Sequence, residues 1–463
     1  MATDSQLASV FKAYDIRGLS PEQIDASFAR RLGKAIAVQF SPKKVMVGRD
    51  MRLTSSVLEN ALIDGLTSSG ISVTRIGLCS TPMFNVLIGL AQNGFDMGVM
   101  VTASHNPGKY NGFKIAKGDC QPVGEGSGME ELRDAFLASK EFSSAHVGTV
   151  ADDPTALDRY IDHIVKLAGL PADMPQLKVA IDAGNGMAGA VLPRLLSRLP
   201  WIEAVPLFFD PDGTFPNHEA NPLKRETLDQ LIDAVKRNGC DVGVAFDGDA
   251  DRVGFVDEQG VALSGDLLTA FLAQEILRTQ PGGLIDYDIR SSWAVPEAVE
   301  AVGGTSAMCK VGHANIKRLM REDGAVFAGE VSMHFYFREL WNCESGDLAM
   351  LLILRCLARQ SRPFSELWKS LQKYAHSDEL NFEVEDKAGV INRLKETYGP
   401  HATSSSELDG IRLEFRDPSD KTKDWWFNVR ASNTEPLLRL NVEAANSEAL
   451  AVRVDELTRA IRS

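Results

Sequence analysis

The sequence has 463 residues, of which 44% are hydrophobic and 24% charged, and its formal net charge is −14. This length allows several domains, and the apolar fraction excludes an intrinsically disordered chain. The acidic balance argues against nonspecific nucleic-acid binding, which requires a basic surface. If the substrate is itself an anion, arginine and lysine side chains must form a local positive pocket in polar or glycine-rich loops.

No segment has the features of a membrane span or a secretory signal. The longest mostly apolar run ends at Arg355 and is far shorter than the roughly 18 residues that a span requires. The N-terminus carries Asp4 and lacks a cationic start followed by an apolar core. Six cysteines occur without a C-x-x-C pair, which is typical of reduced, mostly buried thiols: Cys79, Cys120, Cys240, Cys309, Cys343 and Cys356. We therefore expect a cytoplasmic protein that contacts no membrane.

Short β-rich segments alternate with longer amphipathic ones along the first three quarters of the chain. The predicted helices include 55–68 and 224–237, and the predicted strands are 44–48, 71–76, 97–101, 178–181, 241–246 and 283–285. This alternation is typical of parallel sheets covered by helices. Several strands end in an acidic residue, which hints at repeated α/β units: Asp50, Asp182, Asp247 and Asp288.

The pattern changes after Glu379. Short alternating strands (380–384, 411–415, 425–429 and 437–442) precede a final helix, 447–461. The sequence thus predicts three mixed-sheet α/β domains and a smaller C-terminal α+β domain. We expect their bounds at 1–150, 151–256, 257–370 and 371–463.

The first chemically informative segment is T-A-S-H-N-P at 102–107, directly after the predicted strand 97–101. A serine in a polar loop at a strand's carboxyl end lies where ligands bind in open α/β sheets. His105 and Lys114 supply a proton acceptor and a cation nearby. Taken alone, Ser104 fits an ordinary Ser/Asn/Pro turn equally well.

The second segment is D-G-D-A-D-R at 247–252, after the apolar strand 241–246. Three carboxylates at alternate positions can converge on one hard cation, and the oxygen-only donor set favours Mg²⁺ over zinc. A solvated turn is the alternative. With a metal beside it, Ser104 becomes a candidate phosphoryl carrier.

Two further segments are less specific signals of function. Glu330 and Ser332 follow the predicted strand 325–328 and could receive a sugar's vicinal hydroxyls, although a plain exposed turn fits almost as well. The segment from Arg430 to Thr434 combines an arginine fork with short donors, which suits a phosphate dianion.

Together these segments resemble the α-D-phosphohexomutase superfamily, most closely its bacterial phosphomannomutase/phosphoglucomutase branch. The matching motifs follow the family's order and spacing over essentially the whole chain: FKAYDIRG at 11–18, TASHNP at 102–107, NGFK at 111–114, DGDADR at 247–252, KVGH at 310–313, GEVSMH at 329–334 and RASNTEP at 430–436.

The resemblance implies four domains around a central cleft, a phosphoserine at Ser104, and Mg²⁺ held by Asp247, Asp249, Asp251 and the seryl group. It implies that Glu330 and Ser332 read the sugar. The distal phosphate would be bound by Arg430, Ser432, Asn433 and Thr434. By the same matching, the other expected site residues are Tyr14, Arg17, His105, Lys114, Arg252, Arg290, Gly312, His313 and His334. Of these, Lys114 and His313 are expected to handle protons.

The implied activity interconverts hexose 6-phosphate and hexose 1-phosphate, of mannose, glucose or both, through a hexose 1,6-bisphosphate. The partner is then a small phosphosugar, and we expect a monomer. A phosphoglucosamine mutase, a metal-dependent sugar phosphatase and a silent sugar-phosphate sensor are the alternatives. The chain departs from the branch at Val311, where Thr is common, and at Met333, where a small residue is usual; the second departure bears on which sugars are accepted.

Overall fold

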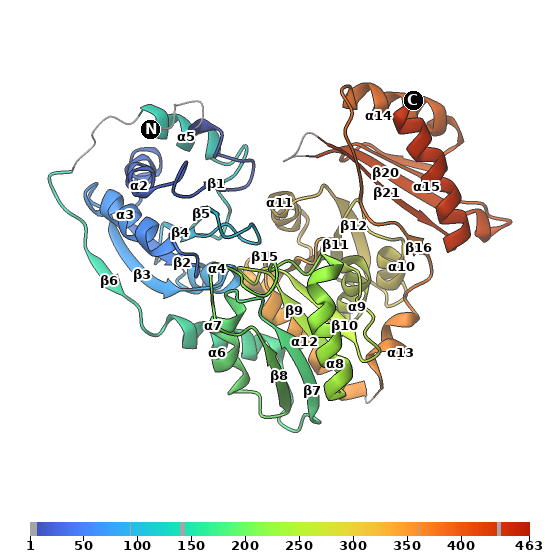
Figure 1. Cartoon of the computed structure of the whole chain (residues 1–463), viewed down its shortest axis with the longest axis horizontal. Helices are drawn as coiled ribbons and strands as arrows, with labels where there is room; N and C mark the ends of the chain where they lie inside the picture. Colours follow the sequence, from blue (N-terminus) through green and yellow to red (C-terminus); the bar gives the residue numbers. More distant parts are fainter. Residues whose placement is uncertain (1–6, 93, 139–143, 361, 433–436) are drawn as a thin grey trace. The chain divides into compact units, whose positions relative to one another are not determined.

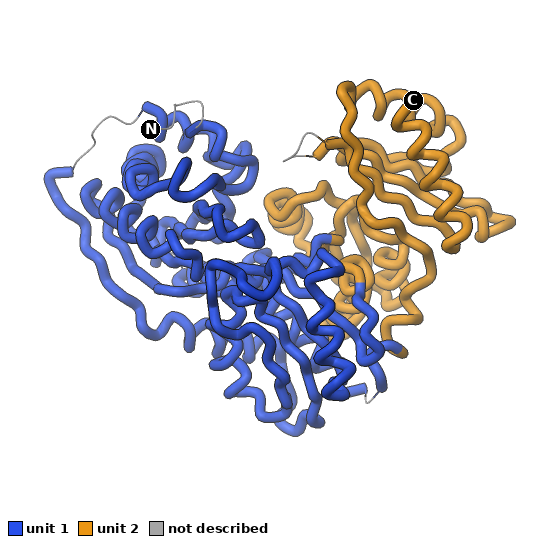
Figure 2. The backbone as a smooth tube through the Cα atoms, in the orientation of Figure 1, with its two compact units in different colours: residues 1–263, 332–365 blue, residues 264–331, 366–463 orange. Residues whose placement is uncertain are grey.

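The computed structural model describes residues 7–92, 94–138, 144–360, 362–432 and 437–463. The chain divides into two compact units, Met1–Leu263 with Ser332–Ser365, and Ser264–Val331 with Glu366–Ser463 (Figure 2). Each unit contains two sheets with helices packed on them. Three α/β domains and a smaller C-terminal α+β domain result, which confirms the predicted fold class.

The first sheet of unit 1 has the strand order β1-β5-β4-β2-β3-β6, in which β2, β3, β4 and β6 are parallel and β5 is antiparallel to both β1 and β4. Helices α2 and α3 lie side by side over it (Figure 1), and with α5 they share its apolar core. Helix α4 packs outside that cluster, against β4. The elements are β1 (Ile16–Leu19), α2 (Ala26–Phe40), β2 (Lys44–Arg49), α3 (Ser55–Thr67), β3 (Ser72–Leu78), α4 (Thr81–Leu90), β4 (Met97–Val101), β5 (Tyr110–Lys117), α5 (Met129–Ala138) and β6 (Val150–Asp152).

The second sheet of unit 1 has the order β10-β9-β7-β8, and only the β9–β10 pair is antiparallel. Helix α8 closes an apolar core against β7, β9 and β10. The returning segment of unit 1 adds the β14–β15 hairpin and α12, which packs on α6 and β10. The elements are α6 (Ala156–Ala168), β7 (Leu177–Asp182), α7 (Ala188–Leu196), β8 (Ile202–Leu207), the 3₁₀ helix η1 (Arg225–Leu228), α8 (Asp229–Asn238), β9 (Val242–Phe246), β10 (Val253–Asp257), β14 (Phe335–Phe337), η2 (Arg338–Leu340), β15 (Cys343–Glu344) and α12 (Gly346–Gln360).

Unit 2 begins with a parallel arrangement in which β11 lies between β12 and β13. Its C-terminal sheet is antiparallel, with β20 and β21 central and α14 and α15 on its apolar core. The elements are α9 (Gly265–Leu277), β11 (Leu284–Asp288), α10 (Ala294–Glu300), β12 (Thr305–Cys309), α11 (His313–Asp323), β13 (Phe327–Gly329), α13 (Phe364–Lys369, across the unit boundary), β16 (Ala375–His376), β17 (Leu380–Phe382), α14 (Lys387–Tyr398), η3 (Gly399–His401), β18 (Ser404–Ser406), β19 (Ile411–Phe415), η4 (Lys421–Lys423), β20 (Trp425–Ala431), β21 (Leu438–Ala444) and α15 (Ser447–Arg462).

The predicted helix 224–237 is wrong at its start. Residues Arg225–Leu228 form a 3₁₀ turn, and the α-helix begins at Asp229. The hydroxyl of Thr227 donates to the carbonyls of Asn221 and Lys224, so local side-chain bonds hold the tighter turn there.

Two exclusions from the sequence can be compared with the structure. All six cysteines are buried, as predicted, and none of them forms a disulfide. Within the described ranges no helix is long and apolar enough to cross a bilayer.

Candidate active site

The three aspartates of the D-G-D-A-D segment converge at the end of β9. Their ligand oxygens lie within 4.8 Å of one another, and Asp247, Asp249 and Asp251 are 0%, 0% and 3% exposed. Oδ1 of Asp249 is buried without a hydrogen-bond partner in the described part of the chain. Three buried carboxylates with an unused oxygen fit a hard cation, because leaving such groups uncompensated would be costly.

The loop that carries Ser104, residues 102–110 and called the serine loop below, meets the aspartates through a close approach of two backbones. Ser104 is 4% exposed, and its Oγ lies 3.5 Å from Oδ2 of Asp247. A Cβ at position 248 would lie 2.6 Å from the carbonyl oxygen of Ser104. Gly248 is therefore required for the two loops to meet. Ser104 itself has φ +52°, a left-handed conformation that is uncommon for a residue with a side chain.

Lys114 bridges two of the carboxylates. Its Nζ lies 2.7 Å from Oδ2 of Asp249 and 2.7 Å from Oδ2 of Asp251. Burial alone would lower the pKa of Lys114, but these two carboxylates raise it above its usual value. In this arrangement Lys114 is a fixed positive charge beside Asp249 and Asp251.

A second chain of polar contacts runs through Arg252. Its guanidinium donates to Nδ1 of His105 at 2.9 Å and to Nε2 of His334 at 3.3 Å, and His105 Nδ1 lies 3.2 Å from Oγ of Ser104. His334 in turn contacts the hydroxyl of Ser332 at 2.9 Å. The structure thus links five predicted residues of unit 1, from Ser104 to Ser332, in one chain of polar contacts.

Electrostatics differ sharply among these groups. Burial, followed by the charges of Arg252 and Arg17, lowers the pKa of His105 well below its usual value, so its imidazole is neutral. Burial and the neighbouring aspartates raise the pKa of Asp247 well above its usual range. Burial also opposes ionisation of Asp251, but Lys114 and His334 outweigh it and lower that pKa.

Arg17 and Tyr14 lie at the start of the first sheet. Arg17, on β1, donates to Oδ1 of Asn106 at 2.7 Å and pairs with Asp15, so it contacts the serine loop directly. Tyr14 is half-buried in the loop that precedes β1.

Arg52 is a site residue that the sequence reasoning missed. Its side chain is 0% exposed and donates to four carbonyl oxygens of the serine loop, those of Ser104 (2.7 Å), Asn106 (2.5 Å), Pro107 (2.9 Å) and Tyr110 (3.0 Å). Asp50, at the end of β2, fixes this guanidinium through its Nε at 3.1 Å. The signal in the sequence was Asp50. It is the acidic residue at the end of β2, and β2 pairs in parallel with β4, the strand that leads into the serine loop.

Unit 2 contains a cluster of arginines around one carboxylate. Glu379 lies 3.0 Å from Arg430, 3.1 Å from Arg439 and 3.4 Å from Arg290. Arg290 also pairs with Asp288 at 2.7 Å. Three guanidiniums around one glutamate leave an excess of positive charge there, which suits an anionic ligand.

The remaining predicted residues of unit 2 lie near the start of α11. Gly312 caps that helix with φ +114° and donates its N–H to Oε1 of Glu330 at 3.0 Å. Glu330 is 1% exposed, and His313 is half-buried as the first residue of α11. Ser432 is half-buried after β20, whereas Asn433 and Thr434 lie outside the described residues.

Comparison with known proteins identifies the family of this chain. Four family models match the chain in succession: phosphoglucomutase/phosphomannomutase alpha/beta/alpha domain I at residues 8–141, domain II at 158–260, domain III at 264–374 and the C-terminal domain at 379–460. The chain belongs to the phosphoglucomutase/phosphomannomutase family.

Full-length relatives agree with this assignment. A Xanthomonas campestris protein described as a phosphohexose mutase is 40% identical over 462 residues, which cover 98% of this chain and 99% of the relative. A phosphomannomutase of Methanocaldococcus jannaschii is 40% identical over 451 residues, 97% of this chain and 96% of the relative. A crystal structure of a family protein from Burkholderia thailandensis superposes with a TM-score of 0.86 at 33% identity, covering 100% of this chain and 98% of the other. The protein is a hexose-phosphate mutase, an isomerase.

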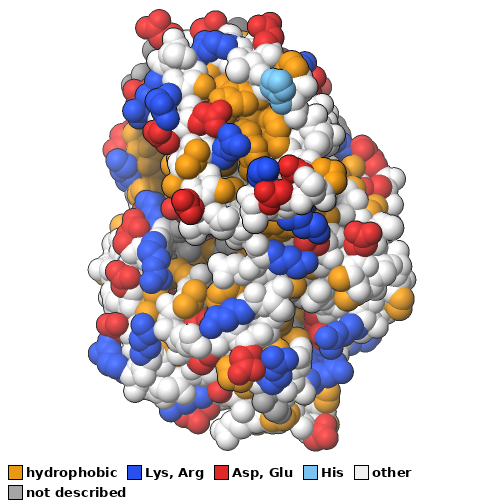
Figure 3. All heavy atoms as spheres, turned by 90° about the vertical axis from the view of Figure 1, so that its right-hand side faces the viewer, with side chains coloured by type: hydrophobic (Ala, Val, Ile, Leu, Met, Phe, Trp, Pro, Cys, Tyr) orange, Lys and Arg blue, Asp and Glu red, His pale blue; other side chains and the backbone are white. Residues whose placement is uncertain are grey.

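The surface of this mutase provides a contrast to the buried site. On the face shown in Figure 3, acidic and basic side chains are interspersed, without a large region of one sign.

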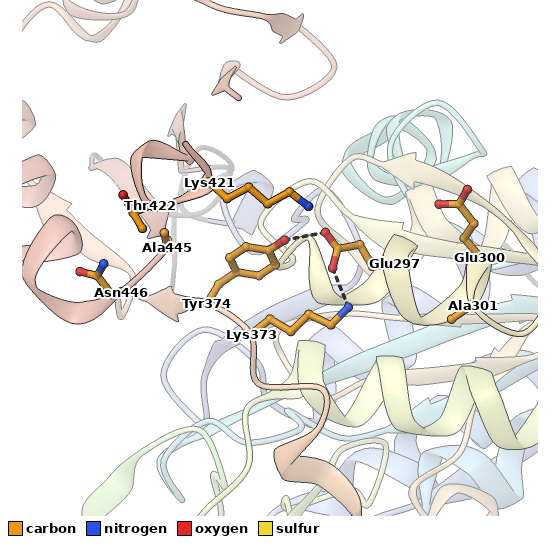
Figure 4. A pocket seen from close by; sticks show the side chains of 9 residues that line it. All are labelled: Glu297, Glu300, Ala301, Lys373, Tyr374, Lys421, Thr422, Ala445 and Asn446. Carbon is orange, nitrogen blue, oxygen red and sulfur yellow. Dashed lines mark hydrogen bonds and ion pairs between the residues drawn. The ribbon is translucent and has the colours of Figure 1, made fainter. Parts of the chain in front are cut away.

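A cavity of about 610 Å³ in unit 2 is lined by Glu297, Lys373, Tyr374 and Lys421 among others, and by none of the predicted site residues. There Tyr374 and Lys373 point to the carboxylate of Glu297 and donate to it at 2.5 and 2.9 Å (Figure 4). These contacts join the start of the C-terminal region to α10.

Proposed function

We propose that the mutase works through a phosphoserine at Ser104, which exchanges its phosphoryl group with either end of a hexose phosphate. The observation that carries this proposal is the position of the seryl Oγ, 3.5 Å from Asp247 at the rim of a buried three-aspartate cluster. A nucleophile, a cation site and two fixed basic groups occur together there, and phosphoryl transfer needs these parts.

We assign Mg²⁺ to the aspartate cluster, with Asp247, Asp249, Asp251 and the seryl group as its ligands. The support is the donor set, which is oxygen-only and buried, with an unpaired oxygen on Asp249. When bound, Mg²⁺ would offset the negative charge of the transferring group.

The chain's own residues then divide the work. The P–O bond to Ser104 breaks as a P–O bond to the free sugar hydroxyl forms; that hydroxyl loses its proton and the seryl oxygen gains one. Arg252 and Lys114 supply positive charge beside the transferring group, which lowers the barrier most when it is fixed in advance. Lys114, whose raised pKa keeps it protonated, is the proposed proton donor, and His313 is the other proposed proton-handling residue. The product of this half-reaction is a hexose 1,6-bisphosphate, whose other phosphate returns to Ser104.

The arginines of unit 2 are the proposed clamp for the phosphate that is not reacting. Arg430 is 2% exposed and Arg290 7%, so both offer desolvated guanidinium groups. Ser432, Asn433 and Thr434 would complete this clamp. Glu330, Ser332, Gly312, His334, Tyr14 and Arg17 are proposed to contact the sugar and its phosphates.

Four assignments continue to rest on the sequence. Glu330 and Ser332 would read hydroxyls that mannose and glucose share, so we propose that the phosphates of both sugars are substrates. We also propose that the chain acts as a monomer in the cytoplasm. The domain bounds 1–150, 151–256, 257–370 and 371–463 stay a prediction.

The decisive experiment compares wild type with Ser104→Ala. The variant should lose activity by about 10⁴-fold or more, as nucleophile deletions do elsewhere, and should keep the melting temperature of the wild type. Intact-mass spectra before and after phosphatase treatment should show one removable phosphate in wild type and none in the variant. Near-native turnover by Ser104→Ala would refute the phosphoserine.

Two parallel measurements separate the alternatives. Inorganic phosphate released as fast as sugar turns over would identify a phosphatase, and substrate binding without turnover would identify a sensor. Comparing kcat/KM for the 1-phosphates of mannose, glucose and glucosamine would then identify the preferred sugar.

A further inference from the structure

Thr81 lies at the start of helix α4, a helix of the first sheet, yet it contacts a residue of the second. It is 1% exposed, and Ser80 before it caps the helix by accepting from the N–H of Met83. The N–H of Thr81 donates to the carbonyl oxygen of Asp249 at 2.9 Å. Its hydroxyl donates to Oδ2 of the same aspartate at 2.6 Å. The main chain and the side chain of Asp249 are therefore both held by one residue.

The hydrogen bonds around Thr81 fix the direction of its single proton. Lys114 Nζ lies 3.3 Å from the hydroxyl oxygen and can only donate to it. The hydroxyl proton has two acceptors in reach, Asp249 Oδ2 at 2.6 Å and Met100 Sδ at 3.4 Å. A carboxylate is by far the stronger acceptor.

This arrangement divides the two oxygens of the Asp249 carboxylate. Oδ2 accepts from both Thr81 and Lys114, whereas Oδ1 is buried with no hydrogen bond in the described part of the chain. A carboxylate anchored through one oxygen presents the other in a fixed direction. Partners of this kind typically change metal affinity 10- to 100-fold when they are removed.

We propose that Thr81 is a positioning residue for the metal site: it orients Asp249 so that Oδ1 faces the cation. This inference rests on the proposed Mg²⁺ site. It also couples the sheet that carries Ser104 to the loop that carries the aspartates, because Thr81 belongs to the former and Asp249 to the latter.

The test uses the full chain after removal of metal by a chelator and measures Mg²⁺ binding by calorimetry. Thr81→Val keeps the shape and removes the hydroxyl, and we expect Mg²⁺ affinity to fall by about 10-fold or more. Thr81→Ser keeps the hydroxyl and should stay within about twofold of wild type. The Mg²⁺ concentration for half-maximal turnover should rise with the dissociation constant, and excess Mg²⁺ should restore much of kcat.

Thr67→Val is the matched control. Its hydroxyl is also buried in the same sheet's helices, but it donates to the carbonyl of Ile63 at 2.9 Å within its own helix and not to a metal ligand. It should lose comparable stability with no change in Mg²⁺ affinity. Thr81→Ala provides a second hydroxyl-free variant if the valine does not fold.

The outcomes are distinct. Wild-type Mg²⁺ affinity in Thr81→Val, or a loss in Thr81→Ser equal to that in Thr81→Val, would overturn the role of Thr81 alone. Wild-type protein without saturable Mg²⁺ binding would overturn the metal assignment, and this inference with it.

Discussion

Asp286 gives a prediction in which the structure supplies both sign and size. It lies on the central strand β11, is 0% exposed, and neither oxygen of its carboxylate accepts a hydrogen bond in the described part of the chain. Burial, and then the carboxylate of Asp323 at the end of α11, raises the pKa of Asp286 to about 8. The native state therefore prefers the neutral acid.

The sign of this pH effect on stability follows from the linkage between proton binding and folding. Because the native pKa is raised, the native state holds its proton more tightly than the unfolded chain does, and this stabilisation is complete below the unfolded pKa near 3.8. It is lost as pH rises towards 8, at about 1.4 kcal/mol per pH unit and about 6 kcal/mol in all, an upper limit because local relaxation and water entry reduce it.

The assay is urea unfolding of wild type and Asp286→Asn between pH 4 and pH 9. Asparagine mimics the neutral acid, so the difference in unfolding free energy should grow in favour of the variant from pH 4 to pH 8 and then level off. Asp323→Asn is the control, and it should keep most of the slope because burial is the larger cause. Parallel profiles for wild type and Asp286→Asn would refute the reasoning.

Three predictions concern the site. Dialysis against a chelator should abolish turnover, and Mg²⁺ should restore it better than Zn²⁺, because the donors are carboxylates; an unchanged rate would contradict the metal assignment. Arg52→Lys keeps the charge but loses the planar fork that binds four carbonyls, so kcat should fall more than about tenfold with little change in KM, as steady-state kinetics would show. Glu379→Gln removes the carboxylate among three arginines, so inorganic phosphate should inhibit several-fold more strongly; equal or weaker inhibition would mean that Glu379 does not compete with anions.

Much of the layered fold could be predicted because the sequence signals were local. Strands 97–101 and 411–415 have the predicted bounds, since each is a short apolar run with clear ends. The strand-end acids were informative beyond the fold. Asp50 accepts from the N–H and the guanidinium of Arg52, and Asp288 does the same for Arg290, so two strands end in the same local turn.

The residue patterns alone could not predict which distant segments meet at the site, and only the family resemblance implied that Ser104 lies beside the aspartates. Ser104 meets Asp247 across 143 positions through the space that Gly248 leaves open. The contact of Thr81 with Asp249 spans 168 positions, so no local pattern in the sequence reveals it. Glu379 gave no signal at all, since a lone glutamate between two strands does not reveal three arginines around it.

Met333 is where the sequence raised a question about sugar choice, and the structure supports a sharp answer. The residue has φ +66°, which explains why a glycine would be natural there, and its side chain is only 6% exposed. It packs over β10, where a Cβ on Gly254 would lie 3.0 Å from its Sδ. Because the side chain fills the space above Gly254, we expect it to make no contact with the sugar. Met333→Gly should relieve roughly 1 kcal/mol of backbone strain but lose about 2 kcal/mol or more of buried packing, so the variant should be modestly less stable.

The mannose-to-glucose ratio of kcat/KM should stay within about twofold of wild type, since selectivity between such analogues requires a contact with the sugar. Met333→Leu, which keeps the packing, should match wild type in both stability and ratio. A ratio that changes several-fold in Met333→Gly but not in Met333→Leu would show that the methionine takes part in sugar selection after all.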